Sequence, residues 1–129
     1  MQKIILDTNF LLIPYTLKVD IFVEIDRIIQ DRYEICIIDR TIAELDNIIE
    51  KQKGKEKQAA KFAKELIRKK KIREIKTEES NQSVDEEILN LSEKEEIIVA
   101  TQDKELKEKL KESGARVIIL RQKSHLKLA

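Results

Sequence analysis

The segment EIIVATQDKELKEKLKESGARVIIL, residues 96–120, holds two short apolar runs on either side of a charged stretch. Residues 96–100 and 117–120 are rich in Ile and Val, which favour β-strands. Residues 104–112 between them are predicted to form a helix, and Gly114 marks its end. Consecutive strands joined by one helix pair in parallel through a right-handed crossover. This segment therefore predicts an α/β fold.

The same alternation of strand and helix patterns runs through the rest of the chain. Hydrophobic periodicity predicts further strands at residues 3–6, 33–38 and 72–75. It predicts helices at residues 8–17 with a break near Pro14, 20–31, 41–50, 55–71 and 84–91. Residues 76–83 are expected to form a polar loop and residues 121–129 a basic tail. This order predicts a three-layer α/β/α sandwich with a central, mostly parallel sheet of four to five strands.

The length and composition set the class of protein. A chain of 129 residues suits one domain, and we expect a single domain over residues 1–129. No apolar run reaches the length needed to cross a bilayer, and the first residues do not resemble a signal peptide. Cys36 is the single cysteine, which predicts a buried, reduced thiol in a cytoplasmic protein without a membrane partner.

The charges are distributed unevenly along the chain. Residues 51–76 carry twelve Lys or Arg and three acids, whereas residues 77–112 carry twelve acids and five bases. A basic segment beside an acidic one suits a nuclease, because one surface can hold phosphates and the other can hold metal ions. A solvated helix face explains the same charges without any function and, taken alone, is the more common explanation.

Four acids lie near the ends of predicted strands or the starts of predicted helices: Asp7, Glu44, Asp85 and Asp103. The carboxyl ends of parallel strands meet at one edge of the sheet, where such folds bind their ligands. Carboxylates that converge there raise one another's pKa, and a divalent cation relieves the repulsion. Mg²⁺ or Mn²⁺ prefers carboxylate oxygens, and one cysteine with one histidine cannot build a structural zinc site.

Each of these acids also has an explanation that involves no chemistry. Asp7 and Asp103 could be helix N-caps. The pairs Thr41-x-x-Glu44 and Ser83-x-x-Glu86 match the capping box, in which two residues satisfy the free amides of a helix start. One at a time, the acids are as well explained as caps, and only their joint placement favours a metal site.

Around these acids the sequence resembles the PIN-domain family over nearly its whole length. The motifs are LDTNFLL, TIAELDNI, VDEEIL, IVATQDKELKEKL and GARVIIL, in that order. The family's Asp-Thr-Asn run matches Asp7, its Glu before an apolar helix residue matches Glu44, its Asp-x-x-Ile run matches Asp85, and its Thr-x-Asp run matches Asp103. The last motif is most similar to archaeal single-domain PIN proteins and to the PIN nuclease of eukaryotic ribosomal RNA processing, and the VapC toxins are more distant.

The resemblance implies a divalent-metal-dependent endoribonuclease that leaves a 5′-phosphate and a 3′-hydroxyl. Asp7 and Asp103 would bind the metal directly, and Glu44 and Asp85 would bind it directly or through water. Asn9 and Thr101 would position the carboxylates or a phosphate. The neighbouring acids are Asp46 and Glu86, so which member of each local pair matters stays open at this point.

Partners follow from the same resemblance. The substrate would be RNA, held by the basic residues Arg68, Lys69, Lys70 and Lys71 and by residues 51–57. The protein would act in ribosomal RNA processing or as a VapC-type toxin with an antitoxin protein, and a homodimer is compatible with the apolar helix faces. A catalytically silent PIN-like RNA-binding module is the alternative. A receiver domain fits less well, because Asp7 has no adjacent acid and residues 72–75 are followed by no Asp.

Overall fold

The computed structural model describes residues 1–77 and 82–129. Its strands are β1 (Gln2–Leu6), β2 (Tyr33–Ile38), β3 (Arg73–Ile75), β4 (Ile97–Ala100), β5 (Arg116–Arg121) and β6 (His125–Leu128). Its helices are η1 (Thr8–Leu12), α1 (Ile13–Thr16), α2 (Ile21–Ile28), α3 (Arg40–Lys51), α4 (Lys55–Lys69), α5 (Val84–Lys94) and α6 (Lys104–Glu112). Within this described part of the chain, no helix is long and apolar enough to cross a bilayer.

The strands form one sheet in the order β3-β2-β1-β4-β5-β6, which runs parallel from β3 to β5. The chain first moves outward from β1 to β2 and β3, and then crosses to the other side of β1 to form β4 and β5. The strand order therefore reverses between β1 and β4, where Leu6 is paired with Ala100. In open α/β sheets, ligands bind beyond the carboxyl ends of the strands at such a reversal.

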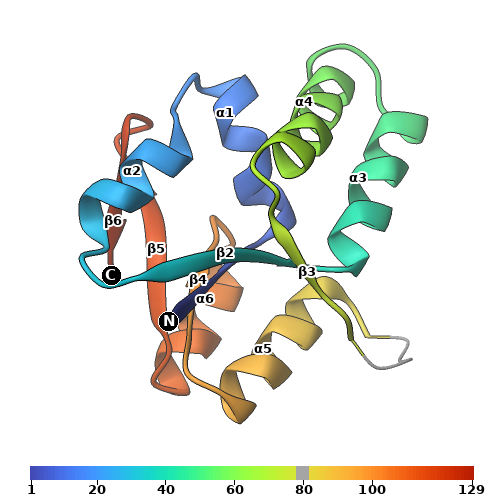
Figure 1. Cartoon of the computed structure of the whole chain (residues 1–129). Helices are drawn as coiled ribbons and strands as arrows, with labels where there is room; N and C mark the ends of the chain where they lie inside the picture. Colours follow the sequence, from blue (N-terminus) through green and yellow to red (C-terminus); the bar gives the residue numbers. More distant parts are fainter. Residues whose placement is uncertain (78–81) are drawn as a thin grey trace.

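Helices cover both faces of the sheet (Figure 1). Successive residues of a strand point to opposite faces, so Ile4 and Leu6 join one hydrophobic cluster while Ile5 joins the other. The larger cluster is closed by η1 and α1–α4, and the smaller one by α5 and α6. The three-layer α/β/α sandwich predicted from the sequence is therefore confirmed.

The predicted basic tail is wrong, and the sheet has six strands instead of four or five. Residues 125–128 form β6, which pairs antiparallel with β5 through a tight turn. Gln122 and Lys123 in that turn have φ angles of 53° and 55°, as in the hairpin turns that match strand twist. Leu126 is 1% exposed, and its backbone contacts the side chains of Arg27 and Glu24 on α2. The short alternation of polar and apolar residues becomes a strand because β5 and α2 supply partners far away in sequence.

The predicted helix at residues 8–17 is two short helices. Residues Thr8–Leu12 form a 3₁₀ turn, and α1 then starts with Pro14 in its first turn. Proline is tolerated there because the first amides of a helix have no intrahelical partner. The predicted strand at residues 72–75 is confirmed as the three-residue β3, and the predicted loop at residues 76–83 lies partly outside the described residues.

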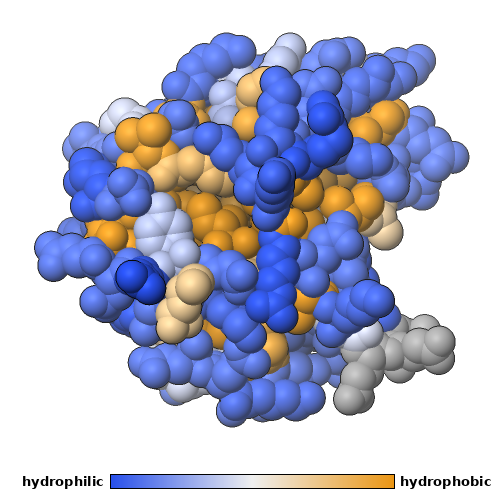
Figure 2. Space-filling view, viewed as in Figure 1, coloured by the Kyte–Doolittle hydropathy of each residue, from blue (hydrophilic) through white to orange (hydrophobic). Residues whose placement is uncertain are grey.

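Hydrophilic residues cover most of the face seen in Figure 2, but hydrophobic residues reach the surface between α2 and α4. Val23 on α2 is 62% exposed and Phe62 on α4 is 38% exposed. The ammonium group of Lys70 lies 5.1 Å from the centre of the Phe22 ring, which links the two helices by a cation–π contact. This region lies on the α1–α4 layer of the sandwich.

Candidate active site

The strand-order reversal brings two sequence-distant segments into contact. The amide of Asp7, just after β1, donates to the carbonyl oxygen of Ala100 at the end of β4, at 2.9 Å. The residues that follow β1 and β4 therefore start side by side. Asp7 and the segment Thr101–Asp103 were predicted from the sequence to meet at this edge, and the structure places them there.

Asp7 is a buried carboxylate, only 3% exposed. One of its oxygens accepts the Thr8 amide at 2.9 Å, and the other accepts the Thr101 hydroxyl at 2.7 Å. Burial raises the pKa of Asp7 above its usual value, although these two hydrogen bonds oppose the shift. The negative charges of Glu44 and Asp103 raise that pKa further, so both acids lie within electrostatic reach of Asp7.

Thr101 also contacts Asp103. The Asp103 amide donates to the Thr101 hydroxyl oxygen at 3.0 Å, and an Asp103 carboxylate oxygen accepts the Leu106 amide at 3.1 Å. Asp103 is therefore the N-cap of α6, as the capping explanation predicted. Capping α6 does not stop the charge of Asp103 from acting on Asp7, because the Leu106 amide donates to only one of the two Asp103 carboxylate oxygens.

Asp85 lies in the first turn of α5 and is half-buried. Ser83 caps this helix by accepting the Glu86 amide at 3.2 Å, in agreement with the predicted capping pair, so Asp85 is free of that role. Burial is the main reason that the pKa of Asp85 rises to about 6, and the charges of Asp7, Asp103 and Glu44 add to the increase.

Glu44 lies in the second turn of α3, and the Thr8 hydroxyl donates to its carboxylate. The predicted capping box of Thr41 and Glu44 is wrong. The helix starts earlier, with Asp39 at its N-cap, so Thr41 is buried inside the helix and its hydroxyl faces that of Thr8 at 3.5 Å. Glu44 therefore needs an explanation other than capping.

A pocket of about 320 Å³ joins these side chains. It is lined by Asp7, Thr8, Asn9, Leu12, Glu44, Asn47, Ile48 and Asp85. Asp103 does not line the pocket, but the Thr101 hydroxyl links it by hydrogen bonds to Asp7, which does. In the described part of the chain, none of the salt bridges involves any of the four predicted site acids. The pocket therefore holds carboxylates whose negative charge is not neutralised by a salt bridge to any basic side chain of the described residues.

The donors suit a hard divalent cation, because carboxylate oxygens without basic partners are the ligands that Mg²⁺ and Mn²⁺ prefer. Among the described residues, however, no three acidic, histidine or cysteine side chains are already placed as a closed ligand set. The chemistry of the donors therefore fits a divalent ion, which Asp7, Glu44, Asp85 and Asp103 would hold.

The neighbouring acids are separated from this pocket. Asp46 forms a salt bridge with Lys64 of α4, with a distance of 2.5 Å, and so points toward the other side of α3. Glu86 is the partner of Ser83 in the capping pair. Of each local pair, it is Glu44 and Asp85 that line the pocket. Asn9 lies at the rim, where its side-chain oxygen accepts the Gln102 amide at 3.3 Å.

Sequence reasoning missed four residues that line the pocket: Thr8, Leu12, Asn47 and Ile48. A helical signal was available for two of them, because Asn47 and Ile48 follow Glu44 by three and four residues and therefore share its face of α3. Thr8 belongs to the Asp-Thr-Asn run that resembled the family, but no local pattern shows that Thr8 and Leu12 face this pocket, because their partners are set by how η1 packs against α3.

The predicted RNA-binding residues lie elsewhere. Arg68 and Lys71 line a different pocket, of about 550 Å³, together with Ile42 and Lys64. That pocket contains none of the four site acids. Lys69 and Lys70 are exposed at the end of α4, and Lys70 lies over the Phe22 ring. The basic segment is therefore not part of the acidic pocket.

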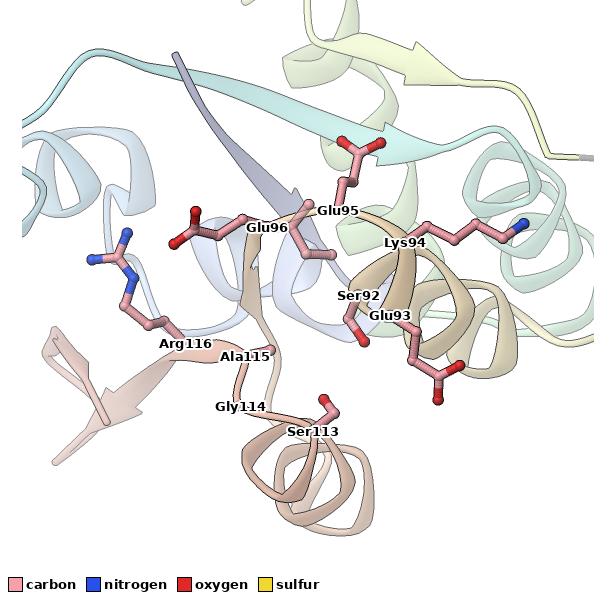
Figure 3. Close-up of a pocket in the computed structure, with 10 residues that line it drawn as sticks. Ser92, Glu93, Lys94, Glu95, Glu96, Ser113, Gly114, Ala115 and Arg116 are labelled. Carbon is pink, nitrogen blue, oxygen red and sulfur yellow. The ribbon is translucent and has the colours of Figure 1, made fainter.

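A further pocket, of about 380 Å³, lies at the opposite edge of the sheet, between the starts of β4 and β5. Its charged side chains Glu93, Lys94 and Glu95 point in different directions (Figure 3). Glu95 is paired with Lys3 at 2.8 Å. Because this pocket lies at the amino ends of the strands and its charges diverge, the acidic pocket is the better candidate for an active site.

The sequence profile of the PIN-like domain family matches residues 4–123, and the chain belongs to this family. The chain is similar to ribonuclease VapC4 of Methanocaldococcus jannaschii, with 38% identity over 99% of this chain and 97% of that protein. Among solved structures it is similar to the PIN domain endonuclease Utp24, with a TM-score of 0.81 and 20% identity, over 98% of this chain and 90% of that one. The second likeness concerns the fold.

Proposed function

We propose that this protein is a divalent-metal-dependent endoribonuclease whose active site is the acidic pocket. The observation that carries the proposal is the placement of four carboxylates, without basic partners in the described part of the chain, at the strand-order reversal of a PIN-like fold. Nuclease activity fits the relative named a ribonuclease, which matches the chain from end to end.

Asp7 and Asp103 are proposed as direct ligands of Mg²⁺ or Mn²⁺, and Glu44 and Asp85 as ligands that bind directly or through water. A bound divalent cation supplies Lewis-acid chemistry, activating water and neutralising phosphoryl charge. Thr101 holds the Asp7 carboxylate at 2.7 Å and thereby fixes one ligand in place. Thr8 orients the Glu44 carboxylate in the same way. Glu44 and Asp85 are proposed to orient the attacking water.

RNA is the proposed substrate, and the basic residues Arg68, Lys69, Lys70 and Lys71 are proposed to hold its backbone outside the pocket. Lys51 offers a second contact on the pocket side, because it follows Glu44 by seven residues and is exposed on the same face of α3.

The relative's name favours a toxin of the VapC type, with an antitoxin protein as partner, and ribosomal RNA processing is the other role proposed. The hydrophobic surface between α2 and α4 supports a protein partner, and a homodimer is one form of it. We also propose a cytoplasmic location, where RNA is found and where the lone buried thiol of Cys36, whose pKa burial raises to about 11, stays reduced.

The test is a cleavage assay on single-stranded and structured RNA with Mn²⁺, Mg²⁺ or excess EDTA. Wild type should cleave only with metal, and Glu44→Gln should lower the rate by at least about 100-fold, since charge stabilisation at a reacting phosphate is a large part of such catalysis. Asp46→Asn is the matched control, because Asp46 lies on the same helix but pairs with Lys64.

Three results would contradict the proposal. Cleavage that persists in excess EDTA would exclude the metal mechanism. Equal rates for Glu44→Gln and Asp46→Asn would exclude the acidic pocket as the active site. A protein that binds RNA but never cleaves it would be the silent PIN-like module.

A further inference from the structure

The acidic pocket has one wall without charge. Leu12 at the end of η1 and Ile48 on α3 line it beside Asp7, Glu44 and Asp85. Both side chains are half-buried, because their other sides pack against the larger hydrophobic cluster. The core therefore holds this apolar wall in place next to the carboxylates.

A metal site for phosphate does not require such a wall. Phosphate and ribose present hydrogen-bonding oxygens, which aliphatic side chains cannot satisfy. The part of a nucleotide with an apolar surface is the face of its base, which stacks on or packs against protein side chains when RNA is bound as a single strand. A base attached to the phosphate at the carboxylates is the nearest such group.

The size of the pocket fits one nucleotide. Its volume of about 320 Å³ is at the lower end of pockets that hold small organic ligands. A base that is stacked and paired in a duplex cannot enter a pocket of this kind, so the nucleotide must be unpaired or turned out of its helix.

Asn47 adds polar groups to the same pocket. It is exposed, and it lies one residue before Ile48 and three after Glu44 on α3. A side-chain amide offers both a donor and an acceptor, which is the pattern needed to bind the edge of a base.

From this arrangement we propose that Leu12, Ile48 and Asn47 form a subsite for one unpaired nucleobase next to the phosphate that is cut. The proposal rests on the ribonuclease function above and names its substrate as single-stranded or locally unpaired RNA. The apolar wall binds the face of the base, and Asn47 contacts its edge and sets a preference among bases.

The experiment compares three synthetic single-stranded RNAs that share one cleavage position. The first is intact, the second lacks the bases of the two nucleotides that flank the cut bond, and the third lacks two bases far from it. In Mn²⁺ and under single-turnover conditions, wild type should cut the second RNA about tenfold more slowly than the first, because the binding free energy of one stacked base usually changes a rate by about that factor. It should cut the third at the intact rate.

Ile48→Ala should cut the intact RNA more slowly and should lose most of the tenfold difference between the first two RNAs. The matched control is Ile42→Ala, since Ile42 is also half-buried on α3 and packs on the same cluster but lines a different pocket. This control should keep the full difference. If Ile48→Ala fails to fold, Ile48→Val takes its place. Ile48→Val should lose part of the difference between the first two RNAs, whereas its control Ile42→Val should keep the full difference.

For the edge contact, Asn47→Ala should flatten the base preference that product sequencing reveals at the cut position in a random RNA pool. Equal rates of wild type on the first two RNAs would overturn the subsite and leave the ribonuclease intact. So would an Ile48 variant that keeps the same discrimination as its Ile42 control. Wild type that cuts none of the RNAs in Mn²⁺ or Mg²⁺ would instead overturn the ribonuclease function itself.

Discussion

At the scale of single residues, the Thr101 hydroxyl connects two of the four proposed metal ligands. It donates to the Asp7 carboxylate at 2.7 Å and accepts the Asp103 amide at 3.0 Å, and it is only 1% exposed. A buried hydroxyl with two partners fixes both in place, because a loss of either hydrogen bond would leave a buried polar group unpaired. Thr101 is thus a positioning residue in this site.

We predict that Thr101→Val lowers the free energy of unfolding by about 1–3 kcal/mol, the usual cost of an unsatisfied buried polar group. Valine has the shape of threonine, so packing should not change. Urea unfolding measures the stability, and RNA cleavage in Mn²⁺ should fall because the Asp7 carboxylate is no longer held. Thr101→Ser, which keeps the hydroxyl, should retain most of both. A valine variant as stable and active as wild type would show that the hydroxyl does not position Asp7.

At the scale of elements, β6 is part of the core and not a tail. Leu126 is 1% exposed, and its backbone is bound on both sides by α2: Leu126 donates to Glu24 at 3.0 Å and accepts from Arg27 at 2.9 Å. Glu24 and Arg27 also pair with each other at 2.9 Å. This contact closes the edge of the larger hydrophobic cluster with the last strand of the chain.

We therefore expect Leu126→Ala to lower the free energy of unfolding by about 2–5 kcal/mol, as for other buried leucines. Lys127→Ala is the control on the same strand, because Lys127 is exposed, and it should change the stability by less than about 0.5 kcal/mol. Chemical denaturation of the variants measures both values. Similar stability for the two variants would mean that residues 125–128 behave in solution as the tail that the sequence suggested.

The basic end of α4 gives a prediction about RNA binding. Neutralising Arg68, Lys69, Lys70 and Lys71 to Gln should weaken RNA binding and flatten its dependence on salt. If all four contact phosphates of a single strand, the slope of log affinity against log salt should become shallower by about 3. Fluorescence anisotropy with labelled RNA, at several salt concentrations in Ca²⁺ or EDTA to prevent cleavage, provides the measurement.

The control for that prediction neutralises an equal number of lysines on α6, which lies on the other face of the sheet: Lys104, Lys107, Lys109 and Lys111. The two sets remove the same charge from the protein but from opposite layers. Equal changes in slope for the two sets would show that net charge alone, and not the end of α4, attracts the RNA.

At the scale of the whole molecule, the pocket is assembled by all three layers. Asp7 and Asp103 follow strands of the sheet, Glu44 comes from the helical layer on one face, and Asp85 comes from the layer on the other. Folding therefore forces negative charges together, and in the absence of metal this opposes the stability of the fold.

The pH dependence of stability follows from Asp85, whose pKa rises from 3.8 to about 6 on folding. A folded pKa above the unfolded value means that the folded protein holds its proton more tightly. In EDTA, the free energy of unfolding should therefore fall as the pH rises from about 4 to about 6 and then level off. Asp85→Asn should make this fall smaller, leaving the part due to Asp7, and should be more stable than wild type at pH 7 by up to about 2 kcal/mol after allowance for solvent screening.

Thermal melts of wild type and Asp85→Asn in EDTA and in Mn²⁺ test the same repulsion from the metal side. Added Mn²⁺ should stabilise wild type more than the variant, because the ion binds only the folded carboxylate cluster. An Asp85→Asn variant that melts below wild type in EDTA at pH 7, with equal gains in Mn²⁺, would show that Asp85 is an ordinary residue of the α5 start.

The sequence by itself determined the α/β/α class and the edge of the sheet where the acids lie. Strands and helices are encoded by local hydrophobic periodicity, and a parallel sheet with helical crossovers has few alternative topologies. Asp7 and Asp103 could be placed together because both directly follow predicted strands, and their motifs resembled those of the family to which the chain belongs.

Only the tertiary structure decided which side chains meet in the pocket. Asp7 and Thr101 are 94 residues apart and Thr8 and Glu44 are 36 apart, so no local pattern reports either contact. Three further features likewise depend on how helices and strands pack across the sheet. They are the start of α3 at Arg40, which leaves Thr41 inside the helix, the pairing of β6 with β5, and the apolar wall of Leu12 and Ile48. Local periodicity predicts which face of its helix or strand a residue occupies, whereas only tertiary packing determines which distant residue it contacts.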